Sequence, residues 1–166
     1  LGGDMRVDKF LHDMNMGTRT QIRKMIKDKL IFVNDTVVKT GRVKVDPVID
    51  EVRLKDQVIE YQQYFYFMMN KPLGVLTATE DRKQKTVMDL FNKVDLRSDL
   101  FPVGRLDKDT QGLLLITNNG QLAHDLLAPE RHVDKTYEAV VTGKITDQAV
   151  EEFQKGITLK DGTTLK

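Results

Sequence analysis

A carboxylate and a guanidinium lie almost side by side in the middle of the sequence, in Arg105-Leu106-Asp107. Phe101-Pro102-Val103 comes before them, and the apolar run 113–116 follows a few residues later. A short apolar run bounded by turn residues predicts a buried strand. Reactive side chains are often carried on turns that a rigid element holds in place. The spacing therefore predicts that Asp107 and Arg105 lie in a polar turn beside a strand, where a carboxylate can act as nucleophile or general base.

Two other interpretations of this turn remain open from the residues alone. Asp and Asn are common in turns because their side chains form local hydrogen bonds. Asp107-Lys108-Asp109 also partly matches the Asp-x-Asp-x-Thr signature of Mg²⁺-dependent phosphatases that use an aspartate nucleophile. That signature ends a buried apolar strand and needs further carboxylates for the metal ion, whereas Gly104, Arg105 and Leu106 precede the aspartate here. Neither interpretation explains the other motifs of the chain.

Those motifs occur on both sides of the turn in a fixed order. Asn70-Lys71-Pro72-Leu73-Gly74 comes before it, Thr110-Gln111-Gly112-Leu113 follows directly, and Lys135-Thr136-Tyr137 comes later. Together with Gly104-Arg105-Leu106-Asp107 they resemble the motifs of pseudouridine synthases. Within that family the chain is most similar to the ribosomal small-subunit type, which modifies 16S rRNA. The resemblance covers essentially all of residues 5–166.

The resemblance implies a role for each candidate site residue. Asp107 is the implied catalytic residue, and Tyr137 lines the implied uridine pocket, where it stacks on the base. Arg105 contacts the RNA backbone or fills the space that the base leaves. Lys71 is either a surface lysine or a contact to the RNA backbone, and we count it with Lys135 among the candidate substrate-binding residues. The target uridine must leave the base stack to reach such a site.

The implied reaction needs no cofactor, because it is an isomerisation without a redox change. The sequence carries no cysteine, which excludes disulfides, thiolate nucleophiles and cysteine-based metal sites. His12, His124 and His132 are far apart and form no ligand pair at helical spacing. We therefore expect neither a metal nor a cofactor.

Two helices and a tight hairpin are predicted near the amino terminus. The first helix covers 7–14, and the second begins at Thr18, where Gln21 is placed to close a capping box. Strands at 31–33 and 36–38 flank a turn at Asn34-Asp35. The apolar spacing predicts the inward side chains of the two helices: Val7, Phe10, Leu11, Met14, Ile22, Met25, Ile26 and Leu30.

Basic residues gather on the second helix. Residues 5–60 carry 12 Lys and Arg against 9 Asp and Glu, whereas residues 61–166 carry 14 against 15. A charge run of this kind is usually a solvated helix face. The segment, however, resembles the alpha-L RNA-binding domain of a ribosomal protein and several RNA enzymes. The resemblance implies that five cations bind RNA phosphates, with a log–log salt slope of about −3 to −4.5: Arg6, Arg19, Arg23, Lys24 and Lys27.

The sequence predicts an α+β protein with two domains. Residues 1–4 resemble an expression-tag remnant, residues 5–60 form the alpha-L domain, and residues 61–166 form a synthase domain with a mixed, mainly antiparallel sheet. We expect strands at 64–69, 113–116 and 135–141, helices at 86–94 and 121–127, and a loop at 129–132. The family pattern continues beyond Lys166 with further strands and a basic partner for the aspartate. We therefore expect the chain to be an incomplete synthase.

Ribosomal RNA, or a small-subunit assembly intermediate, is the expected partner. The composition is 40% hydrophobic and 31% charged, without an apolar run that could cross a bilayer or a signal peptide. We expect a monomer in the cytoplasm that does not contact a membrane. The alternative function is a non-catalytic RNA-binding or ribosome-assembly module.

Overall fold

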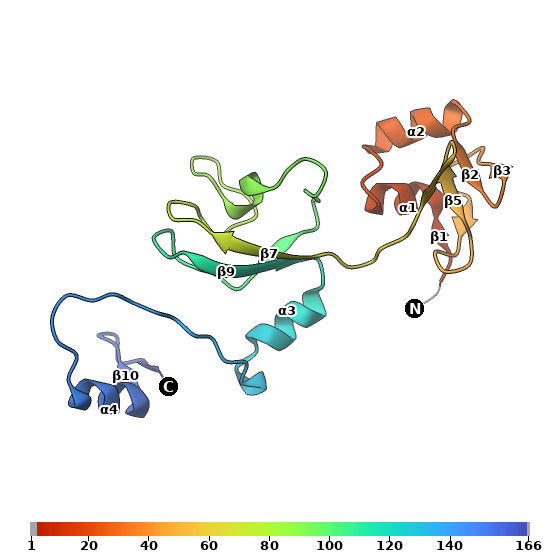
Figure 1. The fold of residues 1–166 in the computed structure, drawn as a ribbon. Helices are drawn as coiled ribbons and strands as arrows, with labels where there is room; N and C mark the ends of the chain where they lie inside the picture. Colours follow the sequence, from red (N-terminus) through yellow and green to blue (C-terminus); the bar gives the residue numbers. More distant parts are fainter. Residues whose placement is uncertain (1–2, 166) are drawn as a thin grey trace. The chain divides into compact units, whose positions relative to one another are not determined.

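The computed structural model describes residues 3–165, which divide into two units, one ending at Val133 and one beginning at Asp134 (Figure 1). Leu1 and Gly2, half of the predicted tag remnant, and Lys166 lie outside the described residues. The first unit contains two hydrophobic cores, which are formed by different parts of the chain.

The first core lies between two helices and an antiparallel sheet. Helices α1 (Val7–Asp13) and α2 (Arg19–Lys27) confirm the two predicted helices. The sheet has the order β3 (Thr36–Val37), β2 (Ile31–Val33), β5 (Val52–Leu54), β6 (Gln57–Ile59), and a separate pair joins β1 (Met5–Arg6) to β4 (Lys44–Val45). Of the predicted inward side chains, Met25 and Leu30 are half-buried and the other six are buried.

The start of α2 is fixed by its own side chains. The Thr18 hydroxyl accepts a hydrogen bond from the Gln21 amide at 3.3 Å, and the Thr18 amide donates to Gln21 Oε1 at 2.8 Å. This reciprocal pair is the predicted capping box, and it satisfies amides that a helix start otherwise leaves without partners. It fixes where the helix begins, and therefore which side chains its basic face presents.

Thr18→Ala is expected to lower the free energy of unfolding by about 1 kcal/mol, because the methyl group cannot accept the Gln21 amide. Thr20→Ala is the matched control, since Thr20 is exposed one residue inside the same helix. Urea unfolding of both variants followed by circular dichroism checks this prediction. Equal losses in the two variants would contradict the importance of the cap.

The hairpin between β2 and β3 turns through two residues of positive φ, Asn34 at 47° and Asp35 at 63°. Such a pair matches the strand twist, and Asn and Asp tolerate it best. Asn34 Nδ2 also donates to Asp50 Oδ1 at 2.6 Å, and the second Asp50 oxygen accepts the Asp46 amide at 2.7 Å. These hydrogen bonds, that from Asp46 foremost, lower the pKa of Asp50.

A carboxylate whose pKa falls on folding stabilises the protein above its unfolded pKa, and this contribution is lost as the pH falls through the folded value. For Asp50 the loss is expected below its ordinary pKa of 3.8. The wild type should therefore be more stable than Asp50→Asn near neutral pH, and the difference should shrink in acid. Thermal unfolding midpoints measured against pH test this, with Asp56→Asn, an exposed carboxylate of the turn between β5 and β6, as control.

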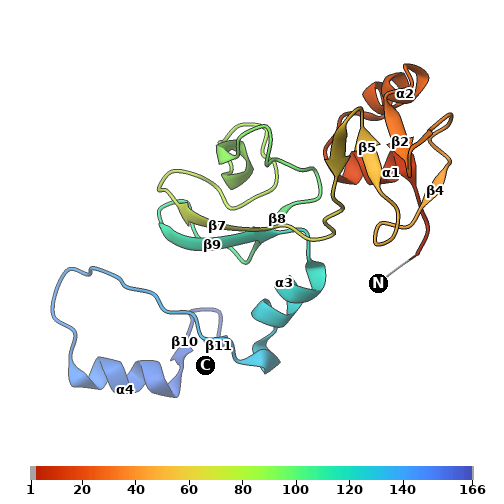
Figure 2. The same cartoon turned by 45° about the vertical axis from the view of Figure 1, so that its right-hand side comes forward.

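The second core lies on one face of a three-stranded antiparallel sheet with the order β7 (Tyr66–Lys71), β9 (Gly112–Thr117), β8 (Phe101–Val103). Residues 72–100 cover this face (Figure 2), and their buried side chains pack against Leu114 and Ile116. The strand at 113–116 is confirmed, whereas β7 lies two residues later than the predicted strand. On the other face Met68 is 80% exposed.

Phe65 precedes β7 and packs against both cores. Its amide donates to Asn118 Oδ1 at 2.8 Å, and the Arg97 guanidinium lies 3.6 Å from the centre of its ring. Arg97 also donates to the carbonyl oxygen of Asp13, at the end of α1. These contacts hold the connection between the two cores.

The helix predicted at 86–94 is wrong in length. Only a 3₁₀ turn, η1 (Val87–Leu90), forms, and Val94 beyond it is 79% exposed. Asn92 explains the early end, because its side-chain oxygen accepts the amides of Val94 and Asp95, both at 2.9 Å. Such local bonds compete with helix continuation. Helix α3 (Gly120–Leu127) confirms the other predicted helix, and its buried residue is Ala123.

The unit from Asp134 onward contains α4 (Asp147–Lys155) and a hairpin of β10 (Ile157–Thr158) and β11 (Thr164–Leu165). The strand predicted at 135–141 does not form, and those residues are exposed without regular structure. A strand exists only when its backbone pairs with a neighbour. The predicted loop at 129–132 contains a 3₁₀ turn, η2 (Pro129–Arg131). Within residues 3–165, no helix combines the length and apolarity that spanning a bilayer would require.

Candidate active site and nucleic-acid interface

Asp107 and Arg105 lie in the connection between β8 and β9, and both are exposed. The connection ends in a turn in which the Thr110 amide donates to the Asp107 carbonyl at 3.0 Å. The sequence prediction of a polar turn beside a strand is therefore confirmed. An exposed carboxylate in this position is accessible to a substrate.

The main chain around Asp107 is held by residues 71–77, which begin at the last residue of β7. The Thr77 hydroxyl donates to the Leu106 carbonyl at 2.7 Å and accepts the Leu106 amide at 3.1 Å. The Gly74 amide donates to the Lys108 carbonyl at 2.7 Å, from a backbone with φ of 80° that favours glycine. The site turn is thus fixed on both sides of Asp107.

Lys71 is completely buried, at 0% exposure. Its ammonium donates to the carbonyl oxygens of Thr110 at 2.8 Å, Asp107 at 2.9 Å and Pro72 at 3.1 Å. This corrects the expectation of a surface lysine or a backbone-phosphate contact, because the ammonium faces protein carbonyls. Strand alternation contained the signal: Lys71 is in phase with Phe67 and Met69, whose side chains pack into the second core.

Tyr137 and Lys135 lie in the unit that begins at Asp134, outside the body that carries Asp107. Tyr137 is 65% exposed, in the stretch without regular structure. Their role at a uridine pocket therefore stays a prediction. Among the residues that the structure describes, no group of three or more His, Asp and Glu gathers as metal ligands would.

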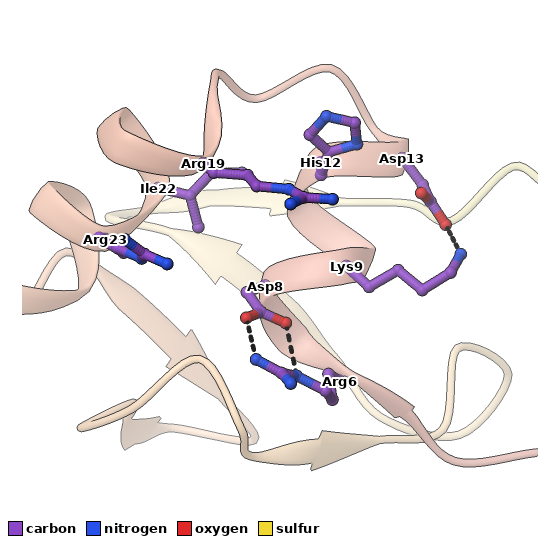
Figure 3. Close-up of a pocket in the computed structure, with 8 residues that line it drawn as sticks. All are labelled: Arg6, Asp8, Lys9, His12, Asp13, Arg19, Ile22 and Arg23. Carbon is purple, nitrogen blue, oxygen red and sulfur yellow. Dashed lines mark hydrogen bonds and ion pairs between the residues drawn. The ribbon is translucent and has the colours of Figure 1, made fainter. Parts of the chain in front are cut away.

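A second candidate site lies between α1 and α2. It is a cavity of about 490 Å³, and Figure 3 shows the side chains around it. Two of the predicted RNA-binding cations on α2, Arg19 and Arg23, line it together with Arg6. The sequence prediction missed His12, Lys9 and the two carboxylates of this site, since only folding brings α1 beside α2.

The five predicted RNA-binding cations differ in whether a carboxylate binds them. Arg6 binds both oxygens of Asp8, and Lys24 binds Asp28 at 2.7 Å. The hydrogen bond that the Lys24 ammonium donates to Asp28 raises the pKa of Lys24. Within residues 3–165, by contrast, Arg19, Arg23 and Lys27 appear in none of the ion pairs. Three of the five predicted RNA-binding cations therefore keep charges that no carboxylate neutralises.

Comparison with known proteins decides between the possible families. The model of the RNA pseudouridylate synthase family matches residues 65–163, which is more than half of the chain. The chain belongs to this family. The model of the S4 domain matches residues 5–48, so the synthase carries an S4 domain that contains α1, α2 and the cavity between them.

The relatives of this synthase include proteins named for the large ribosomal subunit and for the small ribosomal subunit. It is 41% identical to YtzG of Bacillus subtilis, an uncharacterized RNA pseudouridine synthase, over 98% of this chain and 68% of that protein. Identity is 36% to the ribosomal large subunit pseudouridine synthase B of Bacillus subtilis, over 96% and 64%. It is 34% to the ribosomal small subunit pseudouridine synthase A of Haemophilus influenzae, over 94% and 67%. The chain thus spans about two thirds of the length of these relatives.

A solved structure described as a pseudouridylate synthase shares 34% identity over 77% of this chain and 54% of its own, with a TM-score of 0.38.

Proposed function

We propose that the chain isomerises a uridine of 16S rRNA to pseudouridine, with Asp107 as the catalytic carboxylate. The observation that carries the proposal is the position of Asp107 in a chain of the synthase family. Its carboxylate is exposed, while hydrogen bonds from residues 71–77 fix the main chain around it. A preorganised turn of this kind suits a reactive group, since catalysis depends on its placement.

The reaction breaks the bond between uracil N1 and ribose C1′ and forms a bond between C5 and C1′. C5 gives up its proton and N1 gains one, so atoms and charge balance without an oxidant. A carboxylate can assist by attacking the sugar as a nucleophile or by removing a sugar proton. Both routes need the uridine outside the base stack. In this proposal Arg105 contacts the RNA, and Tyr137 and Lys135 belong to the uridine pocket.

The S4 domain supplies the affinity for RNA in this proposal. Phosphate contacts position a protein on RNA without reading its sequence. The unneutralised cations Arg19, Arg23 and Lys27 on α2 suit that role, with Arg6 and Lys24 beside them. The partner is then ribosomal RNA, either free or in a small-subunit assembly intermediate.

The test is pseudouridine formation by this chain in unmodified 16S rRNA and in unmodified 23S rRNA. Both are needed because relatives are named for either subunit. A new pseudouridine at one site of 16S rRNA is the expected result. Modification of 23S rRNA alone would overturn the choice of subunit. If the chain binds RNA but modifies neither rRNA, the result would overturn the proposal that this chain catalyses the reaction. It would favour a non-catalytic RNA-binding or ribosome-assembly module.

A further inference from the structure

The buried ammonium of Lys71 contacts the turn that contains Asp107, yet it has no role in the proposed reaction. Lys71 ends β7, is paired with Gly112 of β9, and has no exposed surface. Its three hydrogen bonds all end on carbonyl oxygens, and it is absent from the ion pairs found in residues 3–165. Burying a charge is unfavourable unless hydrogen bonds replace its water. Lys71 therefore has to be explained by the three carbonyls that it holds.

Two of those carbonyls bracket the turn that presents the proposed catalytic carboxylate. The oxygens of Asp107 and Thr110 are both within 2.9 Å of the Lys71 ammonium. An ammonium has three donors and no acceptor, so it can bind three carbonyls that converge on one point. Hydrogen bonds from a charged donor are about twice as strong as neutral ones. A single side chain thus ties the first and last residues of the turn to the end of β7.

Thr77 makes a second attachment one residue before Asp107. Thr77 is 6% exposed, and its hydroxyl both donates to the Leu106 carbonyl and accepts the Leu106 amide. One side chain therefore binds both the amide and the carbonyl oxygen of Leu106. Together, Lys71 and Thr77 leave the Asp107 main chain little freedom, whereas its carboxylate stays exposed.

We infer that Lys71 and Thr77 are positioning residues, which act through the Asp107 main chain and do not touch the RNA. Lys71 binds the carbonyl oxygens of Asp107 and Thr110 at the two ends of the turn, and Thr77 binds the backbone of Leu106 just before it. The inference rests on the proposed function for its catalytic consequence, since it assigns these two residues to the placement of the Asp107 carboxylate. The hydrogen-bonded clamp itself is independent of the reaction.

Lys71→Met and Thr77→Val remove the donors at nearly constant volume. Both are expected to lower kcat with unchanged KM and RNA affinity, because misplacement of a catalytic group by about 1 Å costs on the order of 10²-fold in rate. We expect about 10²-fold for Lys71→Met and about 10-fold for Thr77→Val. Thr77→Ser keeps the hydroxyl and should restore kcat. Lys93→Met, which removes an exposed lysine of the same domain, is the control for the loss of one charge.

Hydrogen exchange gives a readout that does not depend on activity. In Lys71→Met the Thr110 amide, which donates to Asp107, should exchange faster, while the amides of Leu114 and Ile116 in β9 should keep their protection. If the wild type modifies no RNA and the Thr110 amide still exchanges faster in Lys71→Met, the result would support the role of Lys71 in holding the turn and overturn only the proposed function. Unchanged kcat and unchanged exchange in a folded Lys71→Met would overturn the inference. So would a rise in KM alone, which would mean a substrate contact. If Lys71→Met does not fold, the Thr77→Val and Thr77→Ser pair decides by the same criteria.

Discussion

Asp107→Asn is expected to abolish pseudouridine formation while RNA binding stays within about twofold of the wild type. The substitution keeps the size of the side chain and removes its charge, so the carboxylate can act neither as nucleophile nor as base. A loss on the order of 10³-fold or more is expected for a group in that role. The backbone bonds that hold the turn do not involve the carboxylate and should persist. Single-turnover kinetics on unmodified rRNA measure the rate of pseudouridine formation, and filter binding measures the affinity for the same RNA.

Asp109→Asn is the matched control for this experiment. Asp109 is an exposed carboxylate two residues away in the same turn, and its substitution changes the net charge equally. A synthase should keep most of its activity in this variant. A phosphatase of the Asp-x-Asp type would need both aspartates and Mg²⁺. Equal losses in Asp107→Asn and Asp109→Asn would therefore contradict the assignment of Asp107 as the single catalytic carboxylate.

Arg19→Gln, Arg23→Gln and Lys27→Gln combined are expected to remove most of the salt dependence of RNA binding. Each phosphate contact releases counterions, which contributes about −0.7 to −0.9 to the slope of log K against log salt concentration. Five contacts were expected from the sequence, but Arg6 and Lys24 already bind carboxylates. The three unneutralised cations give a slope of about −2 to −3. Their loss should weaken binding on the order of 50-fold at physiological salt.

A charge-matched variant separates position from net charge. Lys144, Lys155 and Lys160 are exposed lysines of the unit from Asp134 onward, and changing all three to Gln removes the same charge. The slope of this control should stay close to that of the wild type. If both triple variants flatten the slope equally, the effect is one of overall charge, and α2 is not the RNA contact.

Sequence reasoning succeeded where the determining interactions are local. The capping box joins Thr18 and Gln21, three positions apart, and the residue types of Asn34 and Asp35 favour the turn between their strands, so both were predicted and both are present. The polar turn that contains Asp107 was found in the same way, from flanking apolar runs. In each case the signal that predicts the feature lies within a short segment.

It failed where the determining partner is distant in the chain. Lys71 appeared to be a surface residue because its acceptors lie 36 and 39 positions further on, at Asp107 and Thr110. The pattern at 135–141 is strand-like, but a pattern cannot supply the neighbouring strand. The predicted helix beyond Leu90 was wrong for a different reason. Its apolar periodicity favours a helix, but the Asn92 side chain binds the backbone amides of Val94 and Asp95 instead.

Phe65 also affects how substitutions in the two cores combine during evolution. Within the described residues, it is the one apolar side chain that packs against both cores. Substitutions in separate cores without shared partners have additive effects on stability. The segment that carries α2 and the segment that carries Asp107 can therefore accumulate mutations almost independently, so that RNA preference and chemistry diverge on separate routes. Position 65 is the exception, because a change there is felt by both cores at once.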